Sequence, residues 1–140
     1  MTRDTATVFV VDDETSVRQA LTEMLSVFGY HVEAYPSAEG LLQSLDPRQV
    51  GCIVADVRMP EMDGIELVHE LSRRHVDNPV VVISGHADIA MAVAAIKAGA
   101  EDFIEKPIDD NRLVAAINRG LAPVRAAATA GDDTGPPGPF

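Results

Sequence analysis

The sequence has one cysteine, no tryptophan, and half as many basic as acidic residues. The single Cys52 excludes an intrachain disulfide, and its place inside an apolar run indicates a buried side chain rather than a reactive thiol. With 11 Lys and Arg against 22 Asp and Glu, the formal net charge is −11. Nucleic acids and anionic membrane surfaces are bound by clustered cations, so both kinds of partner are disfavoured.

Long apolar runs are also missing. No stretch is long enough to span a bilayer, and residues 1–5 lack the apolar segment of a signal peptide. We therefore expect a cytoplasmic protein that makes no membrane contact. Hydrophobic residues nevertheless make up 46 % of the 140 residues, which suffices for one folded domain with a full core.

Short runs rich in valine and isoleucine recur along the chain, and such runs are typical of strands buried on both faces. The predicted strands cover residues 7–12, 30–35, 51–56, 79–84 and 102–106. The segments between them repeat apolar residues with a helical period. Capping residues mark the ends of several predicted helices: Ser37, Asp88 and Asp109 precede three of them, Gly29 and Gly99 follow two, and Asp46 with Pro47 ends the one after Ser37. A further helix is expected from about residue 64 to residue 74.

Strands that alternate with helices predict an α/β fold, a doubly wound five-stranded parallel sheet with helices on both faces and right-handed crossovers. The last helix is expected to carry Leu113, Ile117 and Leu121. After Leu121 the sequence is rich in alanine, glycine and proline, a composition typical of a flexible segment. We therefore predict one domain over residues 1–121 and a flexible tail or linker over residues 122–140.

The chemistry is expected at the carboxyl ends of the strands, because ligands of open parallel sheets bind there. The first strand leads to Asp12 and Asp13, the third to Asp56, the fourth to Ser84 and the fifth to Lys106. Each of these residues alone would more often be an ordinary loop acid, a turn residue or a solvated lysine. Their shared place at the ends of four strands predicts instead that they form one site.

Such a site is suited to phosphoryl transfer. Neighbouring carboxylates repel one another unless a cation joins them, and Mg²⁺ prefers one or two carboxylates together with substrate phosphate. Lys106 would neutralise phosphate oxygens, and the hydroxyl of Ser84 would donate a hydrogen bond to them. Asp56 would then be the nucleophile.

Four blocks of sequence carry a specific resemblance to a known family. They are Val-Val-Asp-Asp-Glu at residues 10–14, Asp-Val-Arg-Met-Pro-Glu-Met-Asp-Gly at 56–64, Ser-Gly-His-Ala-Asp at 84–88, and Lys-Pro at 106–107. From residue 7 to about residue 121 the chain resembles the receiver domain of bacterial two-component response regulators, and among them the nitrogen-fixation (FixJ-type) regulators. The resemblance implies the flavodoxin-like strand order 2-1-3-4-5.

The resemblance also implies a role for each site residue. Asp56 resembles the phosphoacceptor, Asp13 a direct Mg²⁺ ligand, and Asp12 an acid that holds the metal mainly through water. The metal would also bind Asp56 itself and the backbone carbonyl of Arg58. Ser84 resembles the switch hydroxyl, Phe103 the aromatic switch residue, and Lys106 the ionic partner of the phosphoryl group, joined to Pro107 by a cis bond.

A receiver accepts its phosphoryl group from a sensor histidine kinase or a phosphotransfer protein. It is a signalling module rather than an enzyme, since it catalyses only its own phosphoryl transfer and dephosphorylation. Phosphorylation would switch a surface made by the fourth helix, fifth strand and fifth helix, which would form a homodimer or bind a partner. FixJ-type regulators usually carry a helix-turn-helix domain after a linker, whereas this chain ends in a linker-like segment. No direct nucleic-acid binding is therefore expected, and a free-standing receiver and a part of a longer regulator both stay open.

Arg58 and His86 flank the expected phosphorylation pocket in the sequence. Side chains at such places guide or block water that attacks an acyl phosphate, so we predict that both influence the lifetime of the phosphate. The alternative is that both are solvent-facing loop residues.

Four other functions compete with the receiver interpretation. An aspartate-based phosphatase needs a second acid two residues after its nucleophile, where Arg58 stands. A flavin-binding module places its phosphate loop after the first strand, where Asp12, Asp13 and Glu14 would repel phosphate. Glycine-rich nucleotide motifs do not occur in the sequence. A purely structural interaction module stays open if the metal site is degenerate.

Overall fold

The computed structural model describes residues 6–46 and 48–132. Five strands form one parallel sheet: β1 (Thr7–Val11), β2 (His31–Tyr35), β3 (Gly51–Asp56), β4 (Val80–Ser84) and β5 (Asp102–Glu105). Their order is β2-β1-β3-β4-β5, and every neighbouring pair is parallel. The predicted fold class and strand order are confirmed.

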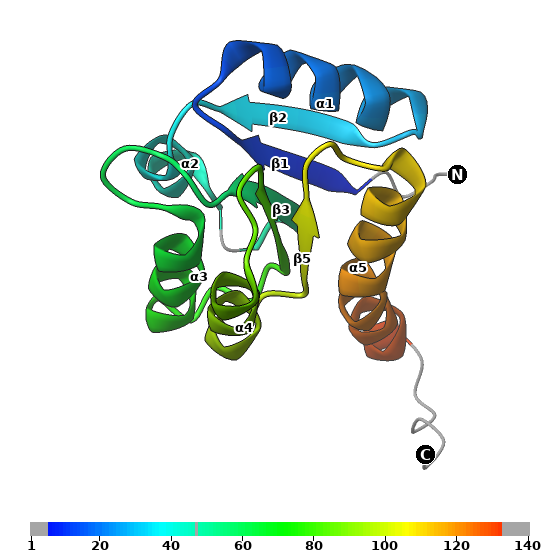
Figure 1. The fold of residues 1–140 in the computed structure, drawn as a ribbon. Helices are drawn as coiled ribbons and strands as arrows, with labels where there is room; N and C mark the ends of the chain where they lie inside the picture. Colours follow the sequence, from blue (N-terminus) through cyan, green and yellow to red (C-terminus); the bar gives the residue numbers. More distant parts are fainter. Residues whose placement is uncertain (1–5, 47, 133–140) are drawn as a thin grey trace.

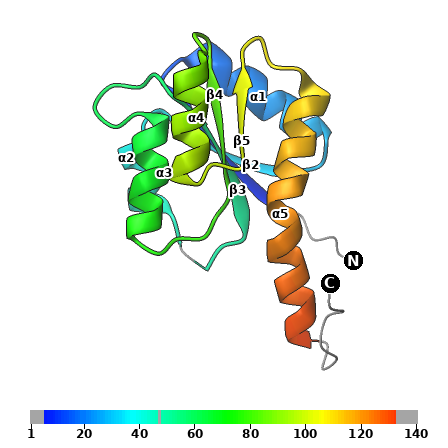
Figure 2. The same cartoon turned by 60° about the horizontal axis from the view of Figure 1, so that its bottom comes forward.

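Helices cover both faces of the sheet. They are α1 (Thr15–Val27), α2 (Ala38–Ser44), α3 (Gly64–Arg73), α4 (Ile89–Ala98) and α5 (Asp110–Asp132). Figures 1 and 2 show α1 and α5 on one side of the sheet and α2, α3 and α4 on the other. Within the described part of the chain, no helix combines the length and the apolar character needed to cross a membrane.

The core lies in two layers because side chains alternate between the faces of each strand. On β1, Val8 and Val10 pack in the layer under α1 and α5, whereas Phe9 and Val11 pack in the layer under α2, α3 and α4. Cys52 is fully buried in the first of these layers, as its apolar surroundings in the sequence predict. Burial raises the pKa of its thiol and keeps it protonated.

Most of the predicted helix ends are confirmed by their caps. The Ser37 hydroxyl accepts a hydrogen bond from the Gly40 N–H at 3.0 Å, and the Asp88 carboxylate accepts one from the Met91 N–H at 2.7 Å. Asp63 precedes α3 and forms a reciprocal capping box with Glu66. Gly29 and Gly99 follow α1 and α4 with φ of +98° and +117°, a conformation that favours glycine.

Two helix ends differ from the prediction. The helix after Ser37 ends at Ser44 rather than at Asp46, and Pro47 lies outside the described residues. The backbone of α5 stays helical to Asp132, past the expected end at Leu121. Leu121 is buried and Ala122 is exposed, and the alanines that follow, which have the highest helix propensity, continue the helix. Of the tail predicted over residues 122–140, residues 133–140 lie outside the described residues.

Replacing Leu67 with alanine is expected to lower the free energy of unfolding by about 2–5 kcal/mol, because this fully buried side chain of α3 fills the layer under that helix. Urea denaturation measures the loss. The matched control is Ile89→Ala on α4, where the side chain is 83 % exposed, so little stability should be lost. Equal losses in the two variants would contradict this account of the core.

Candidate functional site

The carboxyl ends of the strands bring the predicted acids together. Parallel register places Val11 of β1 beside Ala55 and Asp56 of β3 beside Ile83 of β4, so the ends of the central strands are level. Carboxylate oxygens of Asp12, Asp13 and Asp56 all lie within 4.8 Å of one another. This cluster joins the loop after β1 to the last residue of β3, more than 40 positions apart in the sequence.

The acids differ in burial. Asp12 is fully buried and Asp56 is 4 % exposed, whereas Asp13 is exposed. Burial raises the pKa of Asp56, and the negative charge of Asp12 raises it further, while Lys106 opposes both effects. Two carboxylates thus stand side by side in a poorly solvated place, which favours the binding of a cation.

Lys106 supplies part of that positive charge. Its Nζ lies 3.3 Å from Oδ2 of Asp12 and 3.4 Å from Oδ2 of Asp56. Burial disfavours the charged ammonium, but the attraction of Asp12 and Asp56 outweighs burial, so the pKa of Lys106 is raised. The bond between Lys106 and Pro107 is cis, as predicted. Glu14 also reaches Nζ, at 3.9 Å, although its only signal in the sequence is its place next to Asp13.

The backbone orients both buried carboxylates. Oδ1 of Asp12 accepts a hydrogen bond from the Glu14 N–H at 2.9 Å, and Oδ1 of Asp56 accepts one from the Arg58 N–H at 3.3 Å. Their Oδ2 atoms contact Lys106, so one lysine is shared by two acids and a third acid stands beside them. The set of hard oxygen donors with excess negative charge fits Mg²⁺.

The remaining predicted residues surround this cluster. Ser84 is fully buried, and its hydroxyl accepts a hydrogen bond from the His86 N–H at 3.1 Å. The Ser84 carbonyl accepts one from the Lys106 N–H at 2.8 Å. Phe103 is half-buried and packs against the layer under α4. The side chains of Arg58 and His86 are exposed, so each is tied to the site through its backbone N–H.

Gly64 starts α3 and ends the sequence block at residues 56–64, and the structure places it against the site. Its N–H donates to the Val57 carbonyl at 3.1 Å. A Cβ at this position would lie 2.5 Å from the Asp56 carbonyl oxygen, closer than any real contact allows. The absence of a side chain therefore lets α3 begin directly against the backbone of Asp56.

Replacing Gly64 with alanine is expected to lower the free energy of unfolding by about 1–3 kcal/mol, because the backbone of Asp56 must move. Urea denaturation measures the loss. Gly85→Ala is the matched control, since a Cβ there would meet only Lys106 Cδ, at 3.8 Å. Wild-type behaviour of Gly64→Ala would show that the close approach does not matter.

A cavity of about 410 Å³ opens beside the acids. It is lined by Asp13, Arg58 and Asp63, together with Val57, Met59 and Pro60 from the loop after β3. Of the three acids of the cluster, Asp13 lines this cavity.

The comparisons with known proteins agree with this geometry. The family model of the response regulator receiver domain matches residues 8–118. The transcriptional regulatory protein FixJ of Rhizobium meliloti (strain 1021) is 44 % identical over 127 residues, which cover 91 % of this chain and 62 % of FixJ. The chain thus spans about three-fifths of the length of that relative.

Solved structures give the same result. The crystal structure of FixJ-N is 44 % identical and superposes with a TM-score of 0.79, covering 85 % of this chain and 95 % of FixJ-N. The response regulator StyR is 43 % identical with a TM-score of 0.82, covering 92 % of this chain and 67 % of StyR. Signalling through phosphorylation is the general function of such domains. The chain therefore belongs to the receiver domain family of two-component response regulators, with FixJ-type proteins among its relatives.

Proposed function

We propose that Asp56 accepts a phosphoryl group from the phosphohistidine of a sensor histidine kinase or a phosphotransfer protein. The observation that carries this proposal is the Asp56 carboxylate, which is buried at the end of β3 and lies next to Asp12, Asp13 and Lys106. A buried acid among two other acids and one lysine is arranged for chemistry on an anion, because the site already holds charge for a metal and a phosphate.

The transfer uses the residues of the site as follows. A carboxylate oxygen of Asp56 attacks the phosphorus while the phosphorus–nitrogen bond of the donor breaks and its electron pair returns to the histidine. An acyl phosphate on Asp56 and a free histidine result. Lys106 leaves the acids to pair with the phosphoryl oxygens. Asp12, Asp13, Asp56 and the carbonyl of Arg58 would hold Mg²⁺, which supplies positive charge against the phosphoryl oxygens when bound.

The acyl phosphate would then change the surface around α4. We propose that Ser84 turns toward the new phosphoryl oxygens, that Phe103 follows it inward, and that α4, β5 and α5 shift as a unit. On α4 only Ala95 is fully buried, while Ile89, Val93 and Ile96 expose apolar side chains. A helix held by so little burial moves easily, and its apolar side chains offer a surface for a homodimer or a partner.

The experiment is incubation of the full chain with Mg²⁺ and acetyl phosphate, followed by intact-mass measurement and by NMR. The expected results are the mass of one added phosphoryl group and amide shifts in α4, β5 and α5. Ser84→Ala should still gain the phosphoryl group, because its carboxylate nucleophile is intact, yet lose most shifts in α4. A chain that gains no mass would refute the proposed function, and full shifts in Ser84→Ala would refute the switch.

The same proposal covers where the chain acts. We propose a cytoplasmic protein, because histidine kinases donate their phosphoryl groups there. The net charge of −11 disfavours contact with nucleic acid by these residues. The printed name of FixJ describes a transcriptional regulator, and this chain spans only part of FixJ. Transcriptional output would therefore require contacts from outside the receiver.

Arg58→Ala and His86→Ala are each expected to change the dephosphorylation rate severalfold, because both residues adjoin the site: Arg58 lines the cavity next to Asp13, and the His86 N–H donates a hydrogen bond to Ser84. The decay of phosphorylated chain after removal of the donor measures the rate. Arg48→Ala serves as the control, since this exposed side chain pairs with Asp46 in the loop before β3. Unchanged lifetimes in both variants would leave Arg58 and His86 as solvent-facing loop residues.

A further inference from the structure

Arg18 of α1 reaches back to the acidic cluster. Its Nη1 donates a hydrogen bond of 2.7 Å to the carbonyl oxygen of Asp12, and its Nη2 donates one of 3.1 Å to the hydroxyl of Thr15. The side chain is half-buried and forms no ion pair with a described residue. The guanidinium is thus held at two points, and one of them is the backbone of a site residue.

Asp12 has a partner for each of its polar atoms. Its N–H donates to the Tyr35 carbonyl at 3.1 Å, its Oδ1 accepts from the Glu14 N–H at 2.9 Å, and its Oδ2 lies 3.3 Å from Nζ of Lys106. Arg18 supplies the partner of the remaining atom, the carbonyl oxygen. Because Asp12 is fully buried, loss of Arg18 would leave that oxygen without a hydrogen bond or admit water to it.

The bond to this carbonyl also restrains the next residue. The peptide group that joins Asp12 to Asp13 is planar, so its carbonyl oxygen and both Cα atoms lie in one plane. A guanidinium that fixes the oxygen therefore limits where the backbone of Asp13 begins. The side chain of Asp13 is exposed and forms no hydrogen bond with a described residue. The direction of its carboxylate consequently depends on this backbone.

The position of Arg18 in α1 is unfavourable for the helix itself. Arg18 is the fourth residue of α1, and the first turn contains no acidic side chain that would pair with it. Cations near a helix N-terminus are repelled by the partial positive charge there. An arginine at this position is therefore explained by its contact with Asp12 rather than by the stability of the helix.

We propose that Arg18 is a positioning residue for the metal site, which holds the peptide between Asp12 and Asp13 and so keeps both carboxylates in the cluster with Asp56. The inference rests on the proposed function, because it concerns the Mg²⁺ that phosphorylation of Asp56 uses. Arg18 acts on that metal in two opposite ways. Its charge repels Mg²⁺, whereas groups that orient metal ligands raise the affinity, by roughly 10–100-fold in other sites. We expect orientation to outweigh repulsion, so loss of Arg18 should weaken Mg²⁺ binding although it removes a positive charge.

The test is NMR titration of the ¹⁵N-labelled full chain with MgCl₂ at constant ionic strength, without phosphodonor. The amides of Asp13, Asp56 and Arg58 report the dissociation constant. Arg18→Met keeps a long side chain but no donor, and it should bind Mg²⁺ roughly tenfold more weakly than the wild type. Arg18→Lys keeps the charge and a donor group, so it should recover part of this loss.

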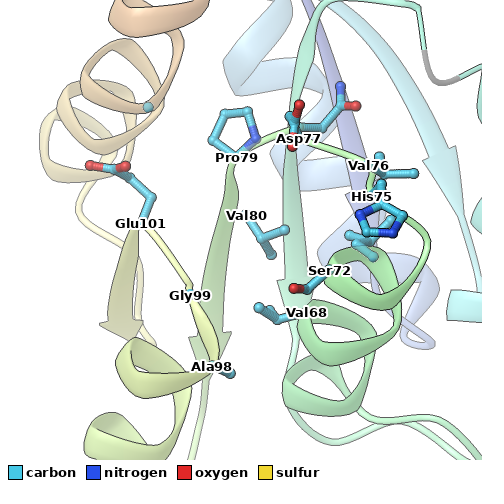
Figure 3. Close-up of a pocket in the computed structure, with 13 residues that line it drawn as sticks. Val68, Ser72, His75, Val76, Asp77, Pro79, Val80, Ala98, Gly99 and Glu101 are labelled. Atoms are coloured by element: carbon cyan, nitrogen blue, oxygen red, sulfur yellow. The ribbon is translucent and has the colours of Figure 1, made fainter.

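Amides far from the site provide an internal reference. His75, Val80 and Gly99 line a cavity of about 480 Å³ between the ends of α3 and α4, which Figure 3 shows. Val80 begins β4, whereas Ser84 at the site ends it, so the length of that strand separates this cavity from the acids. Saturable Mg²⁺ shifts should therefore be absent from these three amides.

Two variants separate positioning from charge and from helix packing. Arg48→Met removes an exposed cation that pairs with Asp46 in the loop before β3. Leu25→Ala removes a fully buried side chain of α1 and lowers stability without touching the Asp12 carbonyl. Both variants should keep the wild-type dissociation constant for Mg²⁺.

Phosphorylation by acetyl phosphate gives a second readout. In Arg18→Met, the Mg²⁺ concentration that gives the half-maximal rate should rise by the same factor as the dissociation constant. The rate at saturating Mg²⁺ should stay within about twofold of the wild type, because the hydrogen bonds of Arg18 go to Asp12 and Thr15 and not to the acceptor Asp56.

Unchanged or tighter Mg²⁺ binding by Arg18→Met would overturn the inference, as would an equal loss in Leu25→Ala or no recovery in Arg18→Lys. If Arg18→Met does not fold, Thr15→Val decides. It removes the hydroxyl that orients the guanidinium and should weaken binding about threefold, so wild-type affinity would contradict the proposed role. A wild type without saturable shifts would refute the metal site of the proposed function, and the inference with it.

Discussion

Asp56→Asn is expected to reduce phosphorylation by acetyl phosphate at least about 100-fold, because the amide lacks the carboxylate oxygen that attacks phosphorus. Asp56 is nearly fully buried and its Oδ2 lies 3.4 Å from Nζ of Lys106, so the substitution removes a carboxylate that the site holds in place. Intact-mass measurement after a fixed incubation with Mg²⁺ gives the fraction of chain that carries a phosphoryl group.

The control for this prediction is Asp110→Asn, which removes one carboxylate from the exposed start of α5 and should phosphorylate like the wild type. Peptide mapping of the wild type should find the phosphoryl group on Asp56. Stoichiometric phosphorylation of Asp56→Asn would show that another residue is the acceptor. Asp13, the exposed acid of the cluster, would then be the next residue to test.

The same substitution should stabilise the metal-free chain. The pKa of Asp56 is raised in the folded state by burial and by the charge of Asp12, so the ionised carboxylate opposes folding. This destabilisation is absent below the pKa of the unfolded chain, about 3.9, and is complete above the folded pKa. Urea midpoints of the wild type should therefore fall below those of Asp56→Asn as the pH rises through this window. Equal midpoints at all pH values would contradict the assigned cause.

Removal of Mg²⁺ is expected to abolish phosphorylation by acetyl phosphate and to lower the stability of the chain. Three carboxylates face one lysine, so a divalent cation relieves their repulsion in the folded state and has no such site in the unfolded chain. At a Mg²⁺ concentration 100 times the dissociation constant, binding stabilises the folded chain by about 2.7 kcal/mol. Thermal melts in EDTA and in rising Mg²⁺ measure this effect independently of phosphorylation.

The Asp13→Asn variant distinguishes stabilisation by Mg²⁺ bound at the acidic cluster from a general effect of salt on stability. The variant should melt at the same temperature in EDTA and in Mg²⁺, because it loses a ligand that the chain exposes at the site. Asp110→Asn should retain the full response. If Mg²⁺ stabilises Asp13→Asn as much as the wild type, the cation binds elsewhere on this acidic chain.

Much of the fold follows from local patterns. Continuous apolar runs predict buried parallel strands, and Ser37, Asp88 and Asp109 predict helix starts, because strand burial and helix capping each depend on a few neighbouring residues. The extent of α5 was missed for a related reason. Alanine favours a helix whether or not the segment packs on a core, so the last predicted core residue, Leu121, did not mark the end of the helix.

The contacts of the site also divide into those that the sequence predicts and those that only the structure reveals. Asp12, Asp56 and Lys106 follow from the rule that parallel strands present their carboxyl ends at one edge, so the sequence alone determines that these groups meet. The contact of Glu14 with Lys106, the close approach of Gly64 to Asp56, and the cavity between the ends of α3 and α4 were decided only by the tertiary structure. They depend on distances of a few ångströms between elements, which are set by how the helices pack on the sheet. The sequence by itself therefore determined that Asp56 and its charged neighbours meet, whereas packing decided how closely the backbone and the surrounding helices approach them.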